Sequence, residues 1–294
     1  MSDRDFKETI LDLLRLGYEG TYWDYKEDYT DCKEDKLIDI ICMANNIDGH
    51  EAYLIYGADD SGNIKGIENT TYSRYTTKSV TEFLRSKPFA GGYVPKISVR
   101  TIKAGNHELD ILIIQSTHNT PYYLTEEFSP SHDSKKKLNA GAIYTRVNDV
   151  NTPRKQTASF EHTEYLWRKR FGIDLSPSQK LLQLLEDTEN WSKTAWDSDR
   201  HSYNLISPEY QIIAFDSNEG YEPLGYFYDD EKMLYAPLQL KYLTTTLYET
   251  ELWYMDMGRC LLPKPERRYN MEDKLFYYYI EQDSLSGKLL PIFA

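Results

Sequence analysis

Apolar residues recur along the first part of this 294-residue chain in two periods, one typical of helices and one typical of strands. Apolar positions three or four residues apart predict helices at 5–16, 33–46, 77–86 and 159–170. Short apolar or alternating runs predict strands at 19–26, 53–57, 64–67, 97–102, 109–114 and 142–147. Because the strands alternate with helices and with hairpin turns, this pattern indicates an α+β domain with a mixed sheet.

The pattern changes near Gly172, where we place the boundary between a first domain, 1–171, and a second domain, 172–294. A helix is expected at 175–191, with a Ser-Pro pair at its start. Beyond it, the chain is rich in tyrosine and predicts strands at 210–215, 221–228, 234–247, 252–257 and 275–281. We therefore expect the second domain to be a smaller, tyrosine-rich α+β domain of unknown role.

The composition is that of a folded protein, because 40% of the residues are hydrophobic. The three cysteines show no metal-ligand spacing and suit a reducing cytoplasm. The charged N-terminus lacks the apolar core of a signal peptide, and no apolar run reaches the roughly 18 residues that span a bilayer. We therefore expect a cytoplasmic protein with no membrane partner.

The net charge of −13 lies mainly in the second domain. From Gly172 onward the net charge is −10, from 11 basic and 21 acidic residues, whereas the preceding residues carry only −3. A near-neutral first domain can hold a basic groove that meets phosphate, while the acidic second domain repels it. The net charge therefore does not exclude a nucleic-acid partner.

Two stretches of the first domain bring carboxylates and a lysine out of apolar surroundings. The first contains Glu19, Asp24 and Lys26, and the second contains the Asp59-Asp60 pair of a predicted turn. On a strand, Asp24 and Lys26 project from the same face, whereas Glu19 needs a bend in the chain to join them. Mg2+ and Mn2+ prefer oxygen ligands, and a neighbouring lysine can hold phosphate. The set predicts a divalent-metal phosphodiesterase site, although a solvated acidic rim beside an ordinary turn has the same composition.

The order of several motifs in the first domain resembles the Schlafen AlbA_2 domain. The matching segments are Asp24-Tyr-Lys26, Met43-Ala-Asn-Asn46, Gly49, Tyr53-Leu-Ile-Tyr-Gly-Ala-Asp-Asp-Ser-Gly-Asn-Ile-Lys-Gly66, Thr120-Pro-Tyr-Tyr123 and Ala142-Ile-Tyr-Thr-Arg-Val147. The likeness covers about residues 8–170. It departs from the family pattern at Asp24, where the family has glutamate, and at His50, which interrupts a double glycine.

This resemblance implies a metal-dependent endonuclease that cleaves structured RNA, notably tRNA, with Mg2+ or Mn2+. Carried onto the matching positions, the metal ligands are Glu19, Asp24 and Asp60, and the neighbouring Lys26 is a catalytic residue that contacts phosphate. Schlafen cores clasp substrate between two related lobes, and because this chain has one, a homodimer is expected. The resemblance also allows a non-catalytic, DNA-binding regulator. A third alternative is a structural or defence-system protein whose acidic second domain binds another protein.

Basic residues near the end of the first domain form the predicted nucleic-acid-binding surface. They are Arg146, Arg154, Lys155, Arg168, Lys169 and Arg170, with Lys135–Lys137 as an extension. Arg168 to Arg170 also suit an ordinary helix C-terminus, which favours positive charge. The aromatic residues Tyr22, Trp23 and Tyr25 either stack on unpaired bases or belong to the core.

Overall fold

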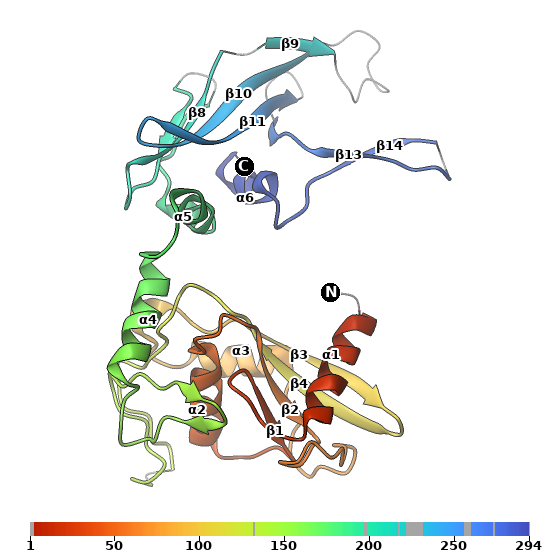
Figure 1. Ribbon diagram of the computed structural model, residues 1–294, viewed down its shortest axis with the longest axis vertical. Coiled ribbons are helices and arrows are strands. Elements are labelled where there is room, and N and C mark those ends of the chain that lie inside the picture. Colours follow the sequence, from red (N-terminus) through yellow and green to blue (C-terminus); the bar gives the residue numbers. More distant parts are fainter. Residues whose placement is uncertain are drawn as a thin grey trace. The chain divides into compact units, whose positions relative to one another are not determined.

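The computed structural model describes residues 3–131, 133–196, 199–216, 218–221, 232–255, 260–272 and 274–293. The chain divides into two compact units, Met1–Ile173 and Asp174–Ala294 (Figure 1). Each unit has its own hydrophobic core. Both units contain helices and strands, so the expected α+β fold class is confirmed. None of the helices in the described ranges is long and apolar enough to cross a membrane.

The first unit is built on a four-stranded mixed sheet in the order β1-β2-β4-β3. The strands are β1 (Trp23–Lys26), β2 (Ala52–Tyr56), β3 (Ile97–Ala104) and β4 (His107–Ile114). β1 runs parallel to β2, and the other neighbouring pairs are antiparallel. Two parallel strands need a crossover connection, which the helix α2 (Lys33–Ala44) provides.

Helices cover both faces of this sheet (Figure 1). α1 (Asp3–Leu16) packs on one face, while α2 and α3 (Thr77–Arg85) pack on the other. All residues of β2 are buried, because a strand that is covered on both faces is apolar on both. α4 (Phe160–Phe171), which begins at the N-cap Ser159, ends the unit.

The expected strand at 64–67 is wrong. Among the described residues, this segment forms a single isolated bridge, between Ala58 and Ile64. The backbone N–H groups of the next two residues both bond to the carbonyl of Gly57, at 2.8 and 2.9 Å. Gly57 has a φ of 99°, a left-handed backbone that favours glycine. The chain therefore turns tightly here instead of continuing as a hairpin.

Two other expected strands of the first unit are shorter than predicted. The strand at 142–147 reduces to β5 (Arg146–Val147), which pairs with β6 (Val150–Asn151). The strand at 19–26 begins only at Trp23, because the preceding residues form a turn. Both differences matter for the site, since they set the directions of Glu19 and Arg146.

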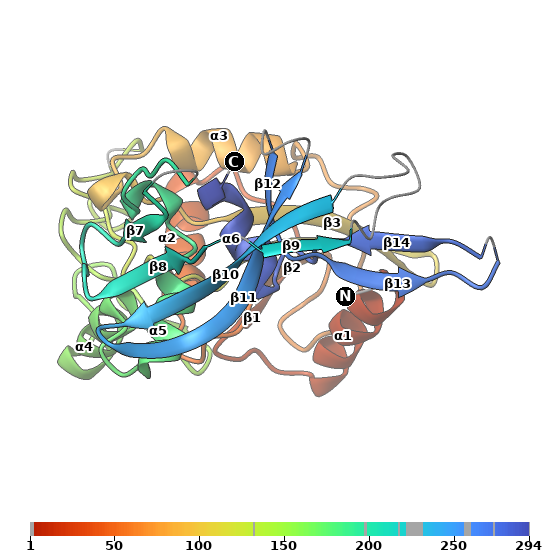
Figure 2. The ribbon, with the colours of Figure 1, turned by 90° about the horizontal axis from the view of Figure 1, so that it is seen from above.

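The second unit is built on an antiparallel sheet in the order β12-β11-β10-β8-β7, with β9 paired to β10. The strands are β7 (His201–Tyr203), β8 (Tyr210–Ala214), β9 (Asn218–Tyr221), β10 (Lys232–Tyr242), β11 (Thr245–Met255) and β12 (Cys260–Pro263). The helices α5 (Pro177–Leu184) and α6 (Leu285–Phe293) contribute to the core of this unit. β13 (Glu266–Tyr269) and β14 (Phe276–Tyr279) form a separate hairpin, seen in Figures 1 and 2.

The expected strand at 234–247 is two strands, β10 and β11, joined by a tight turn. Leu243 occupies that turn with a φ of 51°, and because the turn contains no glycine, asparagine or proline, the pattern carries no turn signal. The expected helix at 175–191 ends at Leu184 and is followed by a 3-10 turn at Thr188–Asn190. The expected strand at 221–228 lies outside the described residues except for its first residue.

Candidate active site

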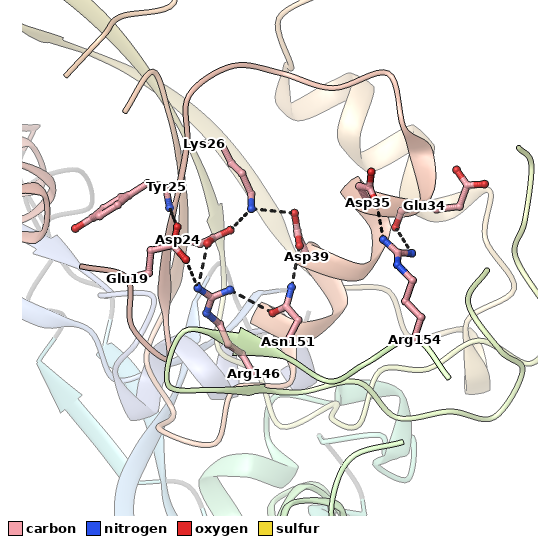
Figure 3. Close-up of polar contacts among 10 residues, drawn as sticks. All are labelled: Glu19, Asp24, Tyr25, Lys26, Glu34, Asp35, Asp39, Arg146, Asn151 and Arg154. Atoms are coloured by element: carbon pink, nitrogen blue, oxygen red, sulfur yellow. Dashed lines mark hydrogen bonds and ion pairs between the residues drawn. The ribbon is translucent and has the colours of Figure 1, made fainter. Parts of the chain in front are cut away.

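β1 sets the direction of the predicted site residues through the alternation of side chains along a strand. Trp23 and Tyr25 are buried in the core that α1 covers, and the Tyr25 hydroxyl donates to the carbonyl of Leu13 at 2.6 Å. Asp24 and Lys26 therefore project from the opposite face, toward α2 (Figure 3). Of the two alternatives for Trp23 and Tyr25, the structure supports the core.

Asp24 is almost completely enclosed, with 2% of its surface exposed. Its Oδ1 accepts a hydrogen bond from Nη2 of Arg146 at 3.0 Å, and Nζ of Lys26 lies 2.6 Å from its Oδ2. Within the described part of the chain, Oδ2 receives no hydrogen bond of good geometry, so the ammonium acts on it as an ion-pair partner. Asp24 therefore lies between two cations and keeps one oxygen that can accept a further ligand.

Arg146 brings Glu19 to Asp24. Its side chain is 3% exposed, and its Nη2 lies 2.7 Å from Oε2 of Glu19. A turn closed by the hydrogen bond from the Gly20 N–H to the Trp23 carbonyl, at 3.1 Å, folds Glu19 back toward the strand. A side chain at Gly20 would collide with the Trp23 ring. This turn supplies the bend that Glu19 needs to reach the face of Asp24.

These residues form a closed ring of polar contacts with two residues that sequence reasoning missed (Figure 3). Nη1 of Arg146 donates to Oδ1 of Asn151 at 3.2 Å, and Nδ2 of Asn151 donates to Oδ1 of Asp39 at 2.9 Å. Nζ of Lys26 lies 3.4 Å from Oδ2 of Asp39. Asp39 could have been found as an acid on the apolar part of α2, between Ile38 and Ile40, since a carboxylate is rarely buried without a partner. Asn151 carries no comparable signal.

Burial and mutual charge perturb the protonation of these acids. Burial, together with the neighbouring Asp24, raises the pKa of Glu19 to about 7. Burial alone would also raise the pKa of Asp24, but hydrogen bonding with Glu19 and the charges of Lys26 and Arg146 hold it below its ordinary value. Burial raises the pKa of Asp39. Although burial opposes it, the charges of Asp39 and Asp24 raise the pKa of Lys26. Glu19 and Asp24 therefore titrate as a pair in which Glu19 takes up the proton.

Asp60 lines the same pocket of about 590 Å³ as the other three predicted catalytic residues. Its side chain is exposed, whereas the carboxylate of Asp59 caps the turn by accepting two backbone N–H groups that follow it. The structure therefore gives these neighbouring aspartates different surroundings. In the described ranges, no three Asp, Glu, His or Cys side chains lie close enough together to hold a metal ion as they stand.

The donor atoms of this pocket nevertheless suit a hard divalent cation. Oδ2 of Asp24 is buried and has Nζ of Lys26 at 2.6 Å as its ion-pair partner, so it keeps a lone pair for a further ligand. Each carboxylate oxygen of Glu19 accepts one hydrogen bond, from the Tyr25 N–H or from Arg146, and so keeps a second lone pair. Two oxygen ligands are thus side by side, and a third requires the exposed Asp60 to turn inward. In donor chemistry, the residues present fit Mg2+ or Mn2+.

The predicted basic residues do not share one environment. Arg146 belongs to the buried ring, where its guanidinium contacts Glu19 and Asp24, so it is not part of an exposed surface with the other basic residues. Arg154 is partly buried, and its Nη2 lies 2.5 Å from Oδ1 of Asp35 (Figure 3). Lys155 is exposed. The sequence does not distinguish a buried arginine, whose charge is paired with a carboxylate inside the protein, from an exposed arginine that can bind phosphate.

The other three predicted basic residues form the last turn of α4. Nη1 of Arg168 lies 3.6 Å from Oε1 of Glu164, and Nζ of Lys169 donates to the Ser116 hydroxyl at 3.1 Å. Nη1 of Arg170 donates to a backbone carbonyl at 2.9 Å. The contacts of Lys169 and Arg170 anchor the helix end to the rest of the unit, whereas that of Arg168 lies within α4. A role for the three residues in nucleic-acid binding stays a prediction.

Residues 19–155, which contain the complete ring of polar contacts, match the family model described as Schlafen, AlbA_2. This part of the chain is a Schlafen AlbA_2 domain. The assignment places it in a nucleic-acid-binding family. No curated protein matches the chain.

Among solved structures, the chain is similar to the crystal structure of the DIP2311 protein from Corynebacterium diphtheriae. The two sequences are 19% identical, and the alignment has a TM-score of 0.35. It covers 65% of this chain and 38% of that chain. The chain containing the AlbA_2 domain thus spans well under half of that protein.

In this AlbA_2 domain, Asn45 connects motifs that are far apart in the sequence. Its buried side-chain amide donates to the carbonyls of Tyr122 at 2.8 Å and Tyr144 at 2.9 Å. Its Oδ1 accepts the N–H of Tyr122 at 2.7 Å. Because Tyr144 precedes Arg146 by two residues, Asn45 fixes the segment that delivers the arginine to the AlbA_2 pocket.

Proposed function

We propose that this AlbA_2 domain is a Mg2+- or Mn2+-dependent endoribonuclease that cleaves structured RNA of the tRNA type in the cytoplasm. The observation that supports it most is the pairing of Glu19 and Asp24 on one buried guanidinium, in a pocket that Lys26 and Asp60 also line. Carboxylates beside a lysine are the groups that metal-assisted phosphodiester cleavage uses. The three unpaired cysteines suit a reducing compartment.

Each residue of the pocket has a proposed role. Glu19, Asp24 and Asp60 hold the ion, which when bound polarises a phosphoryl oxygen and lowers the pKa of a coordinated water. Lys26 holds the scissile phosphate through its ammonium group, which lies 2.6 Å from Asp24. Arg146 keeps the two inner carboxylates side by side, because its charge balances their mutual repulsion.

A second candidate function is nucleic-acid binding without cleavage, as in a DNA-binding regulator. It is favoured by the neutralisation of Asp24, whose two oxygens already face Lys26 and Arg146. It is also favoured by the lack of a ready-made cage of three acids in the described part of the chain. This function predicts an affinity that falls with salt but does not depend on metal or on Glu19.

Cleavage of tRNA by the full chain separates the two functions. The purified protein is incubated with tRNA in Mn2+, in Mg2+ or in EDTA, beside an Asp24→Asn variant. Glu82→Gln is the matched control, because Glu82 is an exposed acid on α3 that does not line the pocket. We expect metal-dependent cleavage by wild type and control, and a loss on the order of a hundredfold or more in Asp24→Asn.

Two outcomes would count against the nuclease. Equal cleavage by wild type and Asp24→Asn would remove the acidic pocket from the reaction. Binding of tRNA by all three proteins in EDTA, without cleavage by any of them in Mn2+ or Mg2+, would support the binding function instead.

We also propose that the domain acts as a homodimer, so that two copies of the pocket face one substrate. The support is that the family match covers one continuous segment, 19–155, so each chain supplies one AlbA_2 domain. Light scattering of the full chain at micromolar concentration should give a dimer mass. A monomer with full activity at that concentration would contradict the dimer.

A further inference from the structure

Two half-buried lysines of the first unit share one aromatic ring. Lys36 of α2 and Lys87, which follows α3, place their Nζ atoms 4.6 and 4.5 Å from the centroid of the Phe83 ring. Lys36 also lies 3.8 Å from the centroid of Tyr75, and Lys87 lies 4.9 Å from that of Phe128. An ammonium group is attracted to the face of an aromatic ring. The rings therefore hold two positive charges at a fixed place on the surface.

A third lysine adds to this positive charge. Lys33 is exposed on α2, one helical turn before Lys36, and its charge acts on both Lys36 and Lys87. None of the three lysines forms an ion pair with a carboxylate among the described residues. We call Lys33, Lys36 and Lys87 the lysine cluster.

The acids beside the lysine cluster are mostly bound to other partners. Glu34 is buried and accepts the backbone N–H of Ser131 at 2.8 Å. Asp35 forms its ion pair with Arg154 at 2.5 Å. Asp31 is exposed and close enough to act on the Tyr75 hydroxyl. The cavity that Lys36 lines also holds Asp39, which pairs with Lys26, and the exposed Asp28. The three positive charges of the cluster therefore outnumber the two exposed acids near it, Asp28 and Asp31.

A bound anion would stabilise the charged form of the lysine cluster, which burial and mutual repulsion now disfavour. Burial, together with the charges of Lys33 and Lys87, lowers the pKa of Lys36 to about 8. Burial also lowers the pKa of Lys87. A ring that already carries ammonium groups is not free to stack on a base. The cluster therefore suits a phosphate group, which is recognised by charge, better than a nucleobase.

The lysine cluster adjoins the candidate active site through a cavity of about 500 Å³. Lys36 and Lys26 both line this cavity. Lys26, Asp28 and Asn151 line the acidic pocket as well as the cavity. A nucleic-acid strand whose phosphate meets Lys26 can therefore continue along the same surface to Lys36.

We propose that Lys33, Lys36 and Lys87 bind the phosphate backbone of the nucleic-acid strand that enters the acidic pocket. That the strand enters the acidic pocket rests on the proposed function. The lysine cluster itself contributes to the affinity for nucleic acid and not to cleavage. Because its contacts reach only phosphate, they are independent of base sequence. The cluster is distinct from the basic residues of 146–170 that the sequence pattern indicates.

Binding measured in EDTA tests the lysine cluster without cleavage. Fluorescein-labelled tRNA is titrated with the full chain by fluorescence anisotropy over a series of KCl concentrations. The test variant is Lys36→Met/Lys87→Met, because methionine keeps an apolar stem on the rings and loses the charge. The matched control, Lys78→Met/Lys103→Met, removes two exposed lysines of the same unit. Both variants therefore have the same net charge.

We expect the test variant to bind tRNA about tenfold or more weakly than the control at about 0.1 M KCl. The slope of log Kd against log salt should fall by about 1.5, because each phosphate contact contributes about 0.7–0.9. Equal weakening in the two variants would show a loss of net charge alone and would overturn the proposal. Thermal unfolding checks that both variants are folded.

A second variant keeps the proposal testable if the double substitution prevents folding. Lys33→Ala changes an exposed side chain, and it should lower the slope by about 0.8; an unchanged slope and affinity would refute the cluster. The two proposals can be contradicted separately. If tRNA binding depends on the lysine cluster but no metal-dependent cleavage occurs, only the nuclease proposal is contradicted. If the protein cleaves tRNA but its affinity is unchanged in the cluster variants, only the proposal for the lysine cluster is contradicted.

Discussion

Nη2 of Arg146 lies 3.0 Å from Oδ1 of Asp24, and both side chains are almost completely buried. This contact joins the β5–β6 hairpin to β1 across 122 positions of the sequence. The same nitrogen reaches Glu19 at 2.7 Å. Charges that are removed from water are tolerated only while each has its partner. The acidic pocket therefore depends on Arg146 for its stability as well as for its shape.

Replacing Arg146 with methionine should destabilise the first unit by about 3–5 kcal/mol, because it leaves the Asp24 carboxylate buried without its guanidinium partner. Urea unfolding followed by tryptophan fluorescence measures the change. The double variant Arg146→Met/Asp24→Asn should recover part of the loss, because the unpaired negative charge is then absent as well. A loss below about 1 kcal/mol for Arg146→Met would contradict a paired-charge role.

The raised pKa of Glu19 should make the folded domain less stable as pH increases. The ordinary pKa of this carboxyl is 4.5, and in the folded protein it is about 7, so the folded state binds more protons between these values. The stabilising contribution is complete below pH 4.5 and is lost as pH rises to about 7. The side chain in Glu19→Gln stays neutral. The free energy of unfolding of this variant should therefore rise relative to that of wild type by about 1–3 kcal/mol between about pH 5 and pH 8.

Urea unfolding of wild type and Glu19→Gln at several pH values measures this difference. Glu82→Gln, at an exposed position of α3, reports the general effect of removing one acid. Parallel stability curves for wild type and Glu19→Gln would show that Glu19 has an ordinary pKa in the folded protein.

Local periodicity predicts most elements of the first unit. α2, β2 and the β3–β4 hairpin lie close to their expected positions, because burial sets their apolar faces. The closed ring of the site could not be predicted in the same way. Glu19 and Arg146 are separated by 127 positions, and no local pattern distinguishes an arginine in a buried ring from one on a basic surface.

Turn chemistry explains the largest differences in secondary structure. A run such as 234–247 has high strand propensity throughout, and Leu243 gives no sign that the chain reverses there. Asp39 is a different case, because its polar character inside an apolar helix was visible in the sequence. Its ion pair with Lys26 depends on the packing of α2 against the face of β1 from which Lys26 projects, and this packing cannot be predicted from the local sequence.

The two aspartates in the turn after β2 should respond differently to loss of charge. Asp59 accepts two backbone N–H groups and lies 3.2 Å from Nζ of Lys65, so Asp59→Ala should lower the unfolding temperature and leave Mn2+ binding intact. Asp60→Ala should change stability little and weaken Mn2+ binding on the order of tenfold, because Asp60 lines the pocket. Thermal unfolding and isothermal titration with Mn2+ measure the two effects. If Asp59→Ala weakened Mn2+ binding and Asp60→Ala did not, Asp59 would be the ligand.

The affinity for RNA should fall between about pH 7 and pH 9 because of Lys36. Its pKa of about 8 means that it loses its proton over this range in the free protein, well below the pKa of an ordinary lysine, about 10.4. Lys33 and Lys87 face it with positive charge, and the pKa of Tyr75 is raised to about 12, so that hydroxyl stays neutral. Anisotropy titrations in EDTA at constant ionic strength measure the change in Kd.

Arginine at position 36 should remove most of this pH dependence. A guanidinium group stays charged across the range and still interacts with the aromatic rings, so Lys36→Arg should bind RNA at about pH 9 nearly as well as at pH 7. Because the pKa of Lys87 is also lowered, a smaller fall in RNA affinity should remain in Lys36→Arg. Lys36→Met should bind weakly at both values and approach wild type at the higher one. If wild type and Lys36→Arg declined in parallel, another group would be the titrating contact.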